Sequence, residues 1–382
     1  MQVVQFQAPR SASHVVMRLV KAYPKYKIVN FDRLDYCASL KNIESIADEP
    51  NYEFVKGDIG SADLVRYVLH KEGIDTIMHF AAQTHVDNSF GNSFSFTECN
   101  VLGTHVMLEA AKSLGSQLKV FIHVSTDEVY GEGASGAKSH ETKTILEPTN
   151  PYAATKAGAE YLVKAYQRSF SLPVIITRGN NVYGPHQYPE KIIPKFVNQL
   201  FRDRKLTMHG DGTNTRNYLY VGDVAAAFDT VLHKGVVGET YNIGGRNEVS
   251  NLKVAETLLQ LMGKVEGEGE EAVAAAREKW IVLVEDRLFN DLRYPLETDK
   301  LASLGWVEEM TWEEGLRTTV EWYRDNSGNW GDIESALVAH PRRGLVPSEG
   351  VPKLVADMPL AAIAGGGKGD SSAKGAGGGG GT

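Results

Sequence analysis

Two groups of residues near the middle of the chain have the types and spacing needed for proton transfer. Tyr152 and Lys156 stand four positions apart, so in a helix they share one face. A neighbouring ammonium favours the phenolate, which lets a tyrosine take a proton from a hydroxyl group. The same spacing is common on ordinary solvated helices. This pair alone therefore leaves both interpretations open.

The second group is the run Ser125-Thr126-Asp127-Glu128, which directly follows the apolar residues 120–124. Two adjacent carboxyl groups can act as acid and base when their surroundings split their pKa values. A helix cap or an Asx turn uses the same residue types. The run therefore indicates either a capped turn or an acid–base pair at the end of a strand.

The segments around these residues alternate between short apolar runs and helical patterns. We predict strands at residues 27–31, 73–80, 120–125 and 173–177, and helices around residues 14–22, 62–71, 103–114 and 155–170. Such alternation predicts a parallel sheet with helices on both faces, and ligands bind beyond the carboxyl ends of its strands. We therefore expect an α/β fold: a Rossmann-like doubly wound parallel sheet with a smaller α/β lobe.

The domain organisation follows from where this alternation stops. We predict a Rossmann-like domain at residues 1–185 and mainly a substrate-binding lobe at residues 186–347. Residues 348–382 are rich in Gly and Ala, and such a segment cannot bury a core, so we predict a disordered tail.

The composition excludes several classes of protein. The 382 residues carry a formal net charge of −8, whereas a nucleic-acid binder usually has a basic stripe. Cys37 and Cys99 form neither a disulfide framework nor a metal-binding spacing, which favours a reducing, cytoplasmic compartment. No apolar run approaches the roughly 20 residues of a membrane span. We expect no nucleic acid, no membrane and no metal. The basic N-terminal stretch also fits a transit peptide, but we interpret it as the first strand and helix.

Three motifs together carry a family resemblance. Ser-Thr-Asp-Glu at 125–128, Tyr-x-x-x-Lys at 152–156 and Asn-Asn-Val-Tyr-Gly-Pro at 180–185 resemble the nucleotide-sugar 4,6-dehydratases of the extended short-chain dehydrogenase family. The likeness runs from about residue 13 to about residue 347. Thr-Asp-Glu is its specific part, because related 4-epimerases lack the acidic pair.

The resemblance also indicates a substrate. Residues 289–294 and 329–341 resemble the dehydratase half of plant UDP-rhamnose synthases, which favours UDP-glucose over dTDP-glucose. The implied product is UDP-4-keto-6-deoxyglucose. The chain stops where those synthases continue, so a separate epimerase and reductase would complete the pathway. Relatives are usually dimers through a helix pair, so we also expect a homodimer.

The resemblance implies roles for individual residues. Tyr152, helped by Lys156 and Thr126, would take the proton of the sugar O4 hydroxyl, Glu128 would remove the C5 proton, and Asp127 would protonate the departing C6 hydroxyl. The implied cofactor is NAD, held by Asp32, Asp35, Asp58, Ile59, Phe80, Ala81, Ala82, Gln83, Cys99, Tyr152 and Lys156. The implied substrate residues are Thr84 and Asn181 at the sugar, and Lys191, Arg216, Asn251 and Arg287 along the diphosphate and uridine.

The chain departs from the family at its first turn. Relatives have a Gly-x-x-Gly-x-x-Gly turn that lets the backbone approach the pyrophosphate at a helix N-terminus. Residues 5–13 of this chain, Gln-Phe-Gln-Ala-Pro-Arg-Ser-Ala-Ser, contain no glycine. Two explanations stay open: a wrongly predicted or alternatively spliced start, or a genuine variant with weak or no NAD binding. The second would make the chain a pseudoenzyme.

Overall fold

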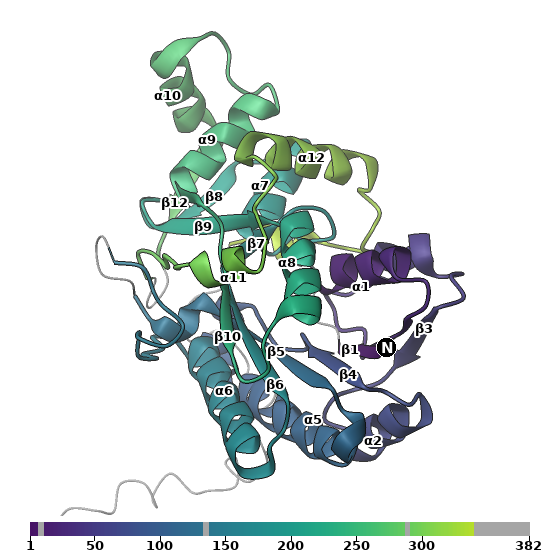
Figure 1. The fold of residues 1–382 in the computed structure, drawn as a ribbon. Helices are drawn as coiled ribbons and strands as arrows, with labels where there is room; N and C mark the ends of the chain where they lie inside the picture. The colour runs from purple at the N-terminus through teal and green to yellow at the C-terminus, as the bar shows by residue number, and fades with distance from the viewer. Residues whose placement is uncertain (7–10, 133–136, 287–290, 340–382) are drawn as a thin grey trace, which may run out of the picture.

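The fold is built on one large parallel sheet. The computed structural model describes residues 1–6, 11–132, 137–286 and 291–339. Seven strands pair in the order β10-β6-β5-β4-β1-β2-β3, and every neighbouring pair is parallel (Figure 1). The strands are β1 (Gln2–Phe6), β2 (Lys27–Asp32), β3 (Tyr52–Lys56), β4 (Thr76–His79), β5 (Val120–Thr126), β6 (Val174–Gly179) and β10 (Thr240–Ile243).

This order confirms the predicted doubly wound α/β fold. The direction of the strand order reverses between β1 and β4, and ligands of open α/β sheets bind in the crevice at such a reversal. The central strands are buried along almost their whole length because helices cover both faces of the sheet. In β4, all four residues are buried.

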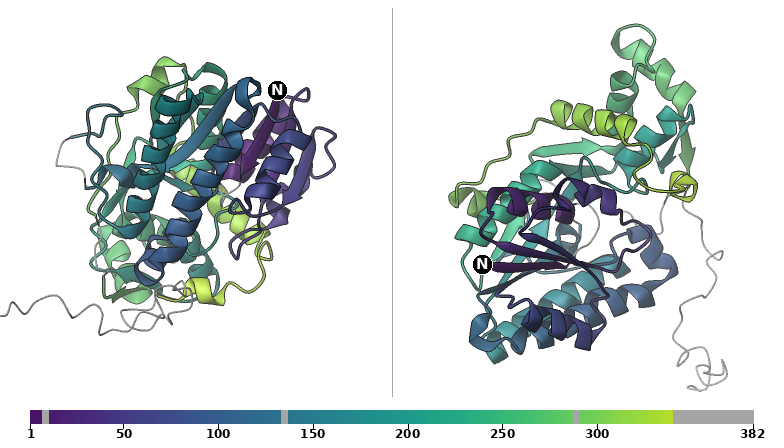
Figure 2. Two further views of the ribbon diagram at one scale, coloured as in Figure 1. Left: turned by 90° about the horizontal axis from the view of Figure 1, so that it is seen from below. Right: turned by 90° about the vertical axis from the view of Figure 1, so that its right-hand side faces the viewer.

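Helices cover the two faces as separate layers (Figure 2). On one face, α1 (Ser11–Ala22) packs beside α8 (Val221–Lys234), and both contribute to a hydrophobic core over the sheet. On the other face lie α2 (Ala62–Lys71), α5 (Gly103–Lys112) and α6 (Pro151–Phe170), with a core of their own. The two cores fix the sheet from both sides, so its carboxyl edge is a rigid platform.

A smaller lobe covers the carboxyl edge of the sheet. It contains a three-stranded sheet of β7 (Asn181–Tyr183), β9 (Thr215–Tyr220) and β11 (Asn247–Ser250), and a two-stranded sheet of β8 (Leu206–His209) and β12 (Ile281–Val284). Its helices share a third core and are α7 (Ile192–Phe201), α9 (Asn251–Leu261), α10 (Gly269–Trp280), α12 (Trp312–Asp325) and α13 (Glu334–Leu337).

The chain passes back from the lobe to the sheet. Residues 221–243 form α8 and β10, which belong to the large sheet, before β11 returns to the lobe. The sheet thus takes its seventh strand from the region that we predicted as mainly a substrate-binding lobe. The division at residue 185 stays a prediction, and the predicted tail at 348–382 lies outside the described residues.

The described part of the chain contains neither a membrane-spanning helix nor a cluster of metal-binding side chains. Within it, no helix is both long enough and apolar enough to cross a membrane. The same residues contain no group of three or more His, Cys, Asp or Glu side chains arranged to hold a metal ion.

Candidate active site

The acidic pair sits where β5 leaves the sheet. The strand ends at Thr126 and runs into a short 3-10 turn, Asp127–Tyr130, which the Thr126 side chain caps by accepting from the Glu128 amide at 3.4 Å. Asp127 is only 3% exposed. Its carboxylate accepts hydrogen bonds from Thr126 Oγ1 at 3.0 Å and from Asn180 Nδ2 at 2.6 Å. The cap and the carboxyl pair therefore coexist, because the threonine supplies the cap.

The two adjacent carboxyl groups lie in different surroundings. Burial, reinforced by the charge of Glu128, raises the pKa of Asp127 to about 7, although the bonds from Asn180 and Thr126 act against this rise. Glu128 lines the main cavity of the protein, where its Oε2 accepts from Asn150 Nδ2 at 3.0 Å. The pair therefore offers a carboxyl group that is partly protonated at neutral pH beside a cavity-lining one.

Tyr152 and Lys156 lie in the first two turns of α6, beside this strand end. The helix starts where Asn150 accepts from the Ala153 amide at 2.9 Å and Pro151 occupies the first turn. Lys156 Nζ donates to the Val124 carbonyl of β5 at 2.7 Å, and burial lowers its pKa to about 8. Tyr152 is 7% exposed. Both side chains are thus buried, and neither lies on a solvated helix face.

The main cavity, of about 330 Å³, is enclosed by the sheet edge and the lobe. Four of the predicted substrate residues line it together with Glu128: Asn181, Lys191, Arg216 and Asn251. Thr84 does not line this cavity but a separate, smaller pocket at the end of β2. Its carbonyl accepts a hydrogen bond from Lys191 Nζ at 2.9 Å. Arg287 lies outside the described residues.

Arg216 is fixed by the segment that follows β12. Its Nη1 donates to the Asp291 carbonyl at 2.8 Å and to the carbonyl of its neighbour Thr215 at 2.7 Å. Its guanidinium carbon lies 5.0 Å from the centre of the Tyr294 ring. The Tyr294 hydroxyl in turn donates to the Asp291 carboxylate. These contacts hold the positive charge of Arg216 at the cavity wall, where Asp291 and Tyr294 are also exposed to the cavity.

A second, smaller pocket of about 50 Å³ lies at the carboxyl end of β2. The predicted cofactor residues in its lining are Asp32, Asp35, Asp58, Ile59, Ala81, Ala82, Gln83 and Cys99. Asp32 Oδ1 accepts from the Leu34 amide at 2.7 Å, and burial raises the pKa of Asp32 to about 6. Phe80 is not part of the lining: it lies in the core, with its ring 4.6 Å from that of Phe228.

An asparagine joins this pocket to α6. Asn100 belongs to a π-helical turn, Thr97–Leu102, and pairs with the backbone of Gln83, accepting from its amide at 2.8 Å and donating to its carbonyl at 3.1 Å. It also donates to Thr155 Oγ1 at 3.0 Å, and that hydroxyl donates to the Tyr152 carbonyl at 2.7 Å. The sequence motifs do not reveal Asn100, because every partner is distant along the chain.

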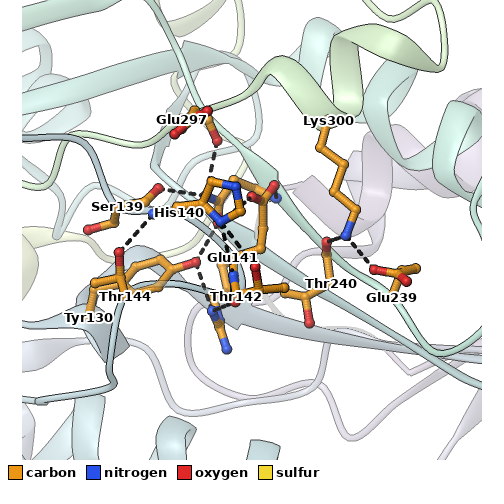
Figure 3. Close-up of polar contacts among 12 residues, drawn as sticks. Tyr130, Ser139, His140, Glu141, Thr142, Thr144, Glu239, Thr240, Glu297 and Lys300 are labelled. Atoms are coloured by element: carbon orange, nitrogen blue, oxygen red, sulfur yellow. Dashed lines mark hydrogen bonds and ion pairs between the residues drawn. The ribbon is translucent and has the colours of Figure 1, made fainter.

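A buried network secures the other side of the acidic turn (Figure 3). Tyr130 donates to Asn242 Oδ1 at 2.8 Å and accepts from Arg178 Nη1 at 2.7 Å. Asn242 also donates its backbone amide to Glu141 Oε1 at 3.0 Å, which ties the segment after the turn to β10. Arg178 forms an ion pair with Glu160 of α6 that is almost fully buried. The network therefore links β6, β10 and α6 around the residues that follow Glu128.

The fold and the site define a Rossmann-like protein of the short-chain dehydrogenase type, with an acidic pair at the end of β5. The family model described as GDP-mannose 4,6 dehydratase matches residues 12–319. The chain therefore belongs to this family of nucleotide-sugar 4,6-dehydratases.

Individual relatives fall within the same group. The chain is 56% identical over 340 residues to an Arabidopsis thaliana trifunctional UDP-glucose 4,6-dehydratase/3,5-epimerase/reductase, covering 88% of this chain and 49% of that protein. It is 49% identical over 330 residues to human dTDP-D-glucose 4,6-dehydratase, covering 86% and 91%. A Streptomyces venezuelae dTDP-glucose 4,6-dehydratase solved with NAD superposes with a TM-score of 0.79 at 38% identity, covering 87% and 99%. The chain spans about half the length of the plant relative.

Proposed function

We propose that this chain is a UDP-glucose 4,6-dehydratase that forms UDP-4-keto-6-deoxyglucose, the first step toward UDP-rhamnose, with NAD as a bound cofactor. The observation that carries the proposal is the split acidic pair. Asp127 is buried with a pKa raised to about 7, while Glu128 beside it lines the cavity. Elimination of water needs an acid and a base together, and this pair offers both.

The residues that line the small pocket suit the adenosine half of NAD. The carboxylates of Asp32 and Asp35 suit the two hydroxyls of a ribose, and the apolar side chains of Ile59 and Ala81 suit a flat ring. When bound, NAD supplies the chemistry of accepting and returning a hydride. Arg33, which lines this pocket, forms ion pairs with both Asp35 and Asp58. Its guanidinium is therefore paired with carboxylates and is not open to the 2′-phosphate of NADP. That pairing favours NAD over NADP.

We assign to Tyr152 the role of removing the proton from the sugar O4 hydroxyl. Lys156, fixed on the Val124 carbonyl, places an ammonium beside the tyrosine on the same helix face. Burial lowers the pKa of Lys156 to about 8, so the amine still carries its charge for the most part at neutral pH. Thr126 Oγ1, engaged with Asp127, completes the hydroxyl groups at this strand end.

The elimination is assigned to the acidic pair. Glu128, whose Oε2 is oriented by Asn150, removes the C5 proton. Asp127 gives a proton to the departing C6 hydroxyl, which leaves as water. The fraction of Asp127 that carries a proton at neutral pH follows from its raised pKa. The buried hydrogen bonds from Thr126 and Asn180 hold its carboxyl group in one orientation.

The nucleotide sugar lies along the main cavity. Asn181 is placed near the hexose, and Lys191 and Arg216 near the diphosphate, because both bring positive charge to the cavity wall. Asn251 and, by resemblance, Arg287 are assigned to the nucleoside side. Thr84 is assigned to the sugar through its contact with Lys191.

Two alternatives have support of their own. The 49% identity to human dTDP-D-glucose 4,6-dehydratase supports dTDP-glucose as the substrate. The absence of glycine from residues 5–13 supports a pseudoenzyme with impaired NAD binding. A 4-epimerase is disfavoured, because the acidic pair has no place in that reaction.

A homodimer is part of the proposal. Tyr161 and Phe170 of α6 are 57% and 51% exposed, and Leu102, directly before α5, is 56% exposed. An apolar surface over two neighbouring helices fits a symmetric contact with a second copy. A cytoplasmic location rests on the isolated cysteines Cys37 and Cys99.

The deciding experiment is incubation of the purified protein with UDP-glucose and added NAD. We expect a 4-keto sugar, detected by its absorbance in alkali, and a product that is lighter by one water. The Asp127→Asn/Glu128→Gln double variant is the matched control, since it keeps the shape of both side chains. If the parent protein gives no product with UDP-glucose or dTDP-glucose, even with a Gly-rich turn grafted ahead of Ser13, the pseudoenzyme remains.

A further inference from the structure

The segment between α12 and the last described residues, residues 326–338, crosses from one ligand pocket to the other. We call it the C-terminal strap. It leaves the end of α12, passes the turn around Asn329 and forms the short helix α13 against α7. In Figure 1 it has the yellow-green colour of the end of the described chain. The proposed function assigns this segment no role.

The first end of the strap is fixed beside the cofactor pocket. Asn329 donates to Asn42 Oδ1 at 2.9 Å and its carbonyl accepts from Ser39 Oγ at 2.7 Å. Both partners lie shortly after residues 35–38, which line that pocket. Next in the strap, Trp330 packs edge-on against Tyr188, with ring centres 5.8 Å apart. The turn is therefore held by both polar and aromatic contacts.

The second end is fixed to the lobe. Gln199 Nε2 donates to the Leu337 carbonyl at 2.8 Å, and Lys195 Nζ donates to the Val338 carbonyl. The side chain of Leu337 is buried at 2% exposure in the core of the lobe, and Glu334 pairs with Arg204 at 2.6 Å. With its carbonyls engaged and its apolar side chain buried, α13 is held as a fixed wall.

That wall faces the substrate cavity. Ser335, Ala336 and Val338 line the cavity, and the lobe contributes Lys195, Phe196, Thr207, Met208 and His209 to the same lining. This part of the lining belongs to the lobe, as does Asn251, which the proposed function assigns to the nucleoside side, so we assign it to the base. Apolar groups from Phe196, Met208 and Ala336 beside polar groups from Thr207, His209 and Ser335 suit a flat ring with polar edges, as a pyrimidine base has.

We propose that α13 forms one wall of a pyrimidine subsite, and that Ala336 sets its width and so selects uracil over thymine. This inference rests on the proposed function. The two bases differ at the ring by one methyl group on C5, which carries no hydrogen bond, so only the width of the slot can distinguish them. A rigid wall can exclude one methyl group by roughly 10–200-fold in affinity. A mobile wall would move aside and admit the methyl group.

The test measures binding of UDP and 5-methyl-UDP by titration calorimetry, which isolates the methyl group and needs no turnover. The full chain is used in the presence of NAD. We expect the parent to bind UDP about 10-fold or more tightly than 5-methyl-UDP. Ala336→Val narrows the slot and should weaken both ligands, 5-methyl-UDP more. Ala336→Gly widens it and should bring the two affinities together.

Ala339→Val is the matched control, because it makes the same change three residues on at a position outside the cavity lining. It should leave both affinities at the parent values. If Ala336→Val and Ala336→Gly also keep the parent affinities, the strap is not the wall and the inference is overturned, while the proposed function stands. If the folded parent binds neither ligand, the proposed nucleotide substrate fails, and the inference fails with it.

Discussion

Asn180 donates one hydrogen bond to Asp127 Oδ2 at 2.6 Å and another to the Tyr294 carbonyl at 3.0 Å. Its own Oδ1 accepts from the Gly245 amide at 3.3 Å. The amide is thus held in a single orientation by three different segments. A donor fixed in this way stabilises the ionised carboxylate and limits how far burial can raise the pKa of Asp127.

The first prediction follows from that bond. In Asn180→Ala the donor is lost, so the pKa of Asp127 rises further above about 7. Because the proposed acid acts in its protonated form, dehydration falls as pH rises through this pKa. The falling limb of the pH–rate profile should therefore move to higher pH by about one unit. Asn181→Ala is the control, and it should change KM while leaving the limb in place. An unmoved limb in Asn180→Ala would remove Asp127 as the acid.

The second prediction separates the two carboxyl groups. Glu128→Gln loses the base, so the sugar C5 hydrogen should no longer exchange with deuterium from the solvent. Asp127→Asn keeps that base but loses the acid, so exchange at C5 should continue while water elimination falls by about 100-fold or more. Mass spectrometry of the recovered nucleotide sugar measures both. Loss of exchange in both variants would contradict the separate roles.

The parts of the site that could be predicted from the sequence are those that follow strands. Asp32 is the last residue of β2, and Thr126 ends β5 where Asp127 and Glu128 begin the next turn. Parallel strands present their carboxyl ends at one edge of the sheet. Polar residues at several strand ends can therefore be predicted to lie close together even when the distances between them are unknown. The small pocket gathers residues from the ends of β2, β3 and β4 for this reason.

The parts that could not be predicted depend on contacts between distant residues. Asn180 and Asp127 are 53 positions apart, and Asn100 and Thr155 are 55 apart. The sequence around an asparagine does not indicate which residue it will bond to at such a separation. The seventh strand, β10, was missed because it returns from the lobe to the sheet, and a short apolar run does not say which sheet it joins. Phe80 follows a strand like its neighbours, yet its side chain faces the core.

The third prediction concerns the stability of the protein without cofactor. Burial raises the pKa of Asp32 from 3.8 to about 6, so the folded state binds the proton more tightly than the unfolded chain. Stability is therefore lost as pH rises from about 3.8 to 6, and the full penalty is present above that window. Asp32→Asn should raise the unfolding free energy at pH 7.5 by about 3 kcal/mol, and weaken NAD binding. Denaturation at pH 7.5 and pH 4 measures this, and an equal gain at both values would contradict it.

The fourth prediction addresses the buried pair of Arg178 and Glu160, which are 1% and 0% exposed. Arg178→Met leaves the Glu160 carboxylate without its bidentate partner, so the unfolding free energy should fall by about 3–5 kcal/mol. The Arg178→Met/Glu160→Met double variant removes the unpaired charge as well and should recover most of this loss. Urea denaturation of the parent and both variants decides it. A double variant no more stable than the single one would show that the loss comes from packing or from the Tyr130 contact.

The fifth prediction concerns the turn without glycine. Phe6, Pro9 and Ala12 have the spacing of the three glycines in the family pattern Gly-x-x-Gly-x-x-Gly, so they stand at the positions of those glycines. Ala12 is small and fully buried in the core at the start of α1, as a residue that allows close packing of helix and sheet must be. A phenylalanine and a proline at the other two places oppose close approach of the backbone to a pyrophosphate.

Phe6→Gly/Pro9→Gly should therefore tighten NAD binding by about 10–100-fold, which is the gain expected from one or two restored hydrogen bonds to a charged group. UDP binding should stay unchanged, since the described residues that line the main cavity all come from other segments of the chain. Calorimetry with each ligand measures both, and Pro24→Gly, in the turn after α1, is the control for a general effect of losing a proline. If the double variant binds NAD no better than the parent, the missing glycines do not limit cofactor binding.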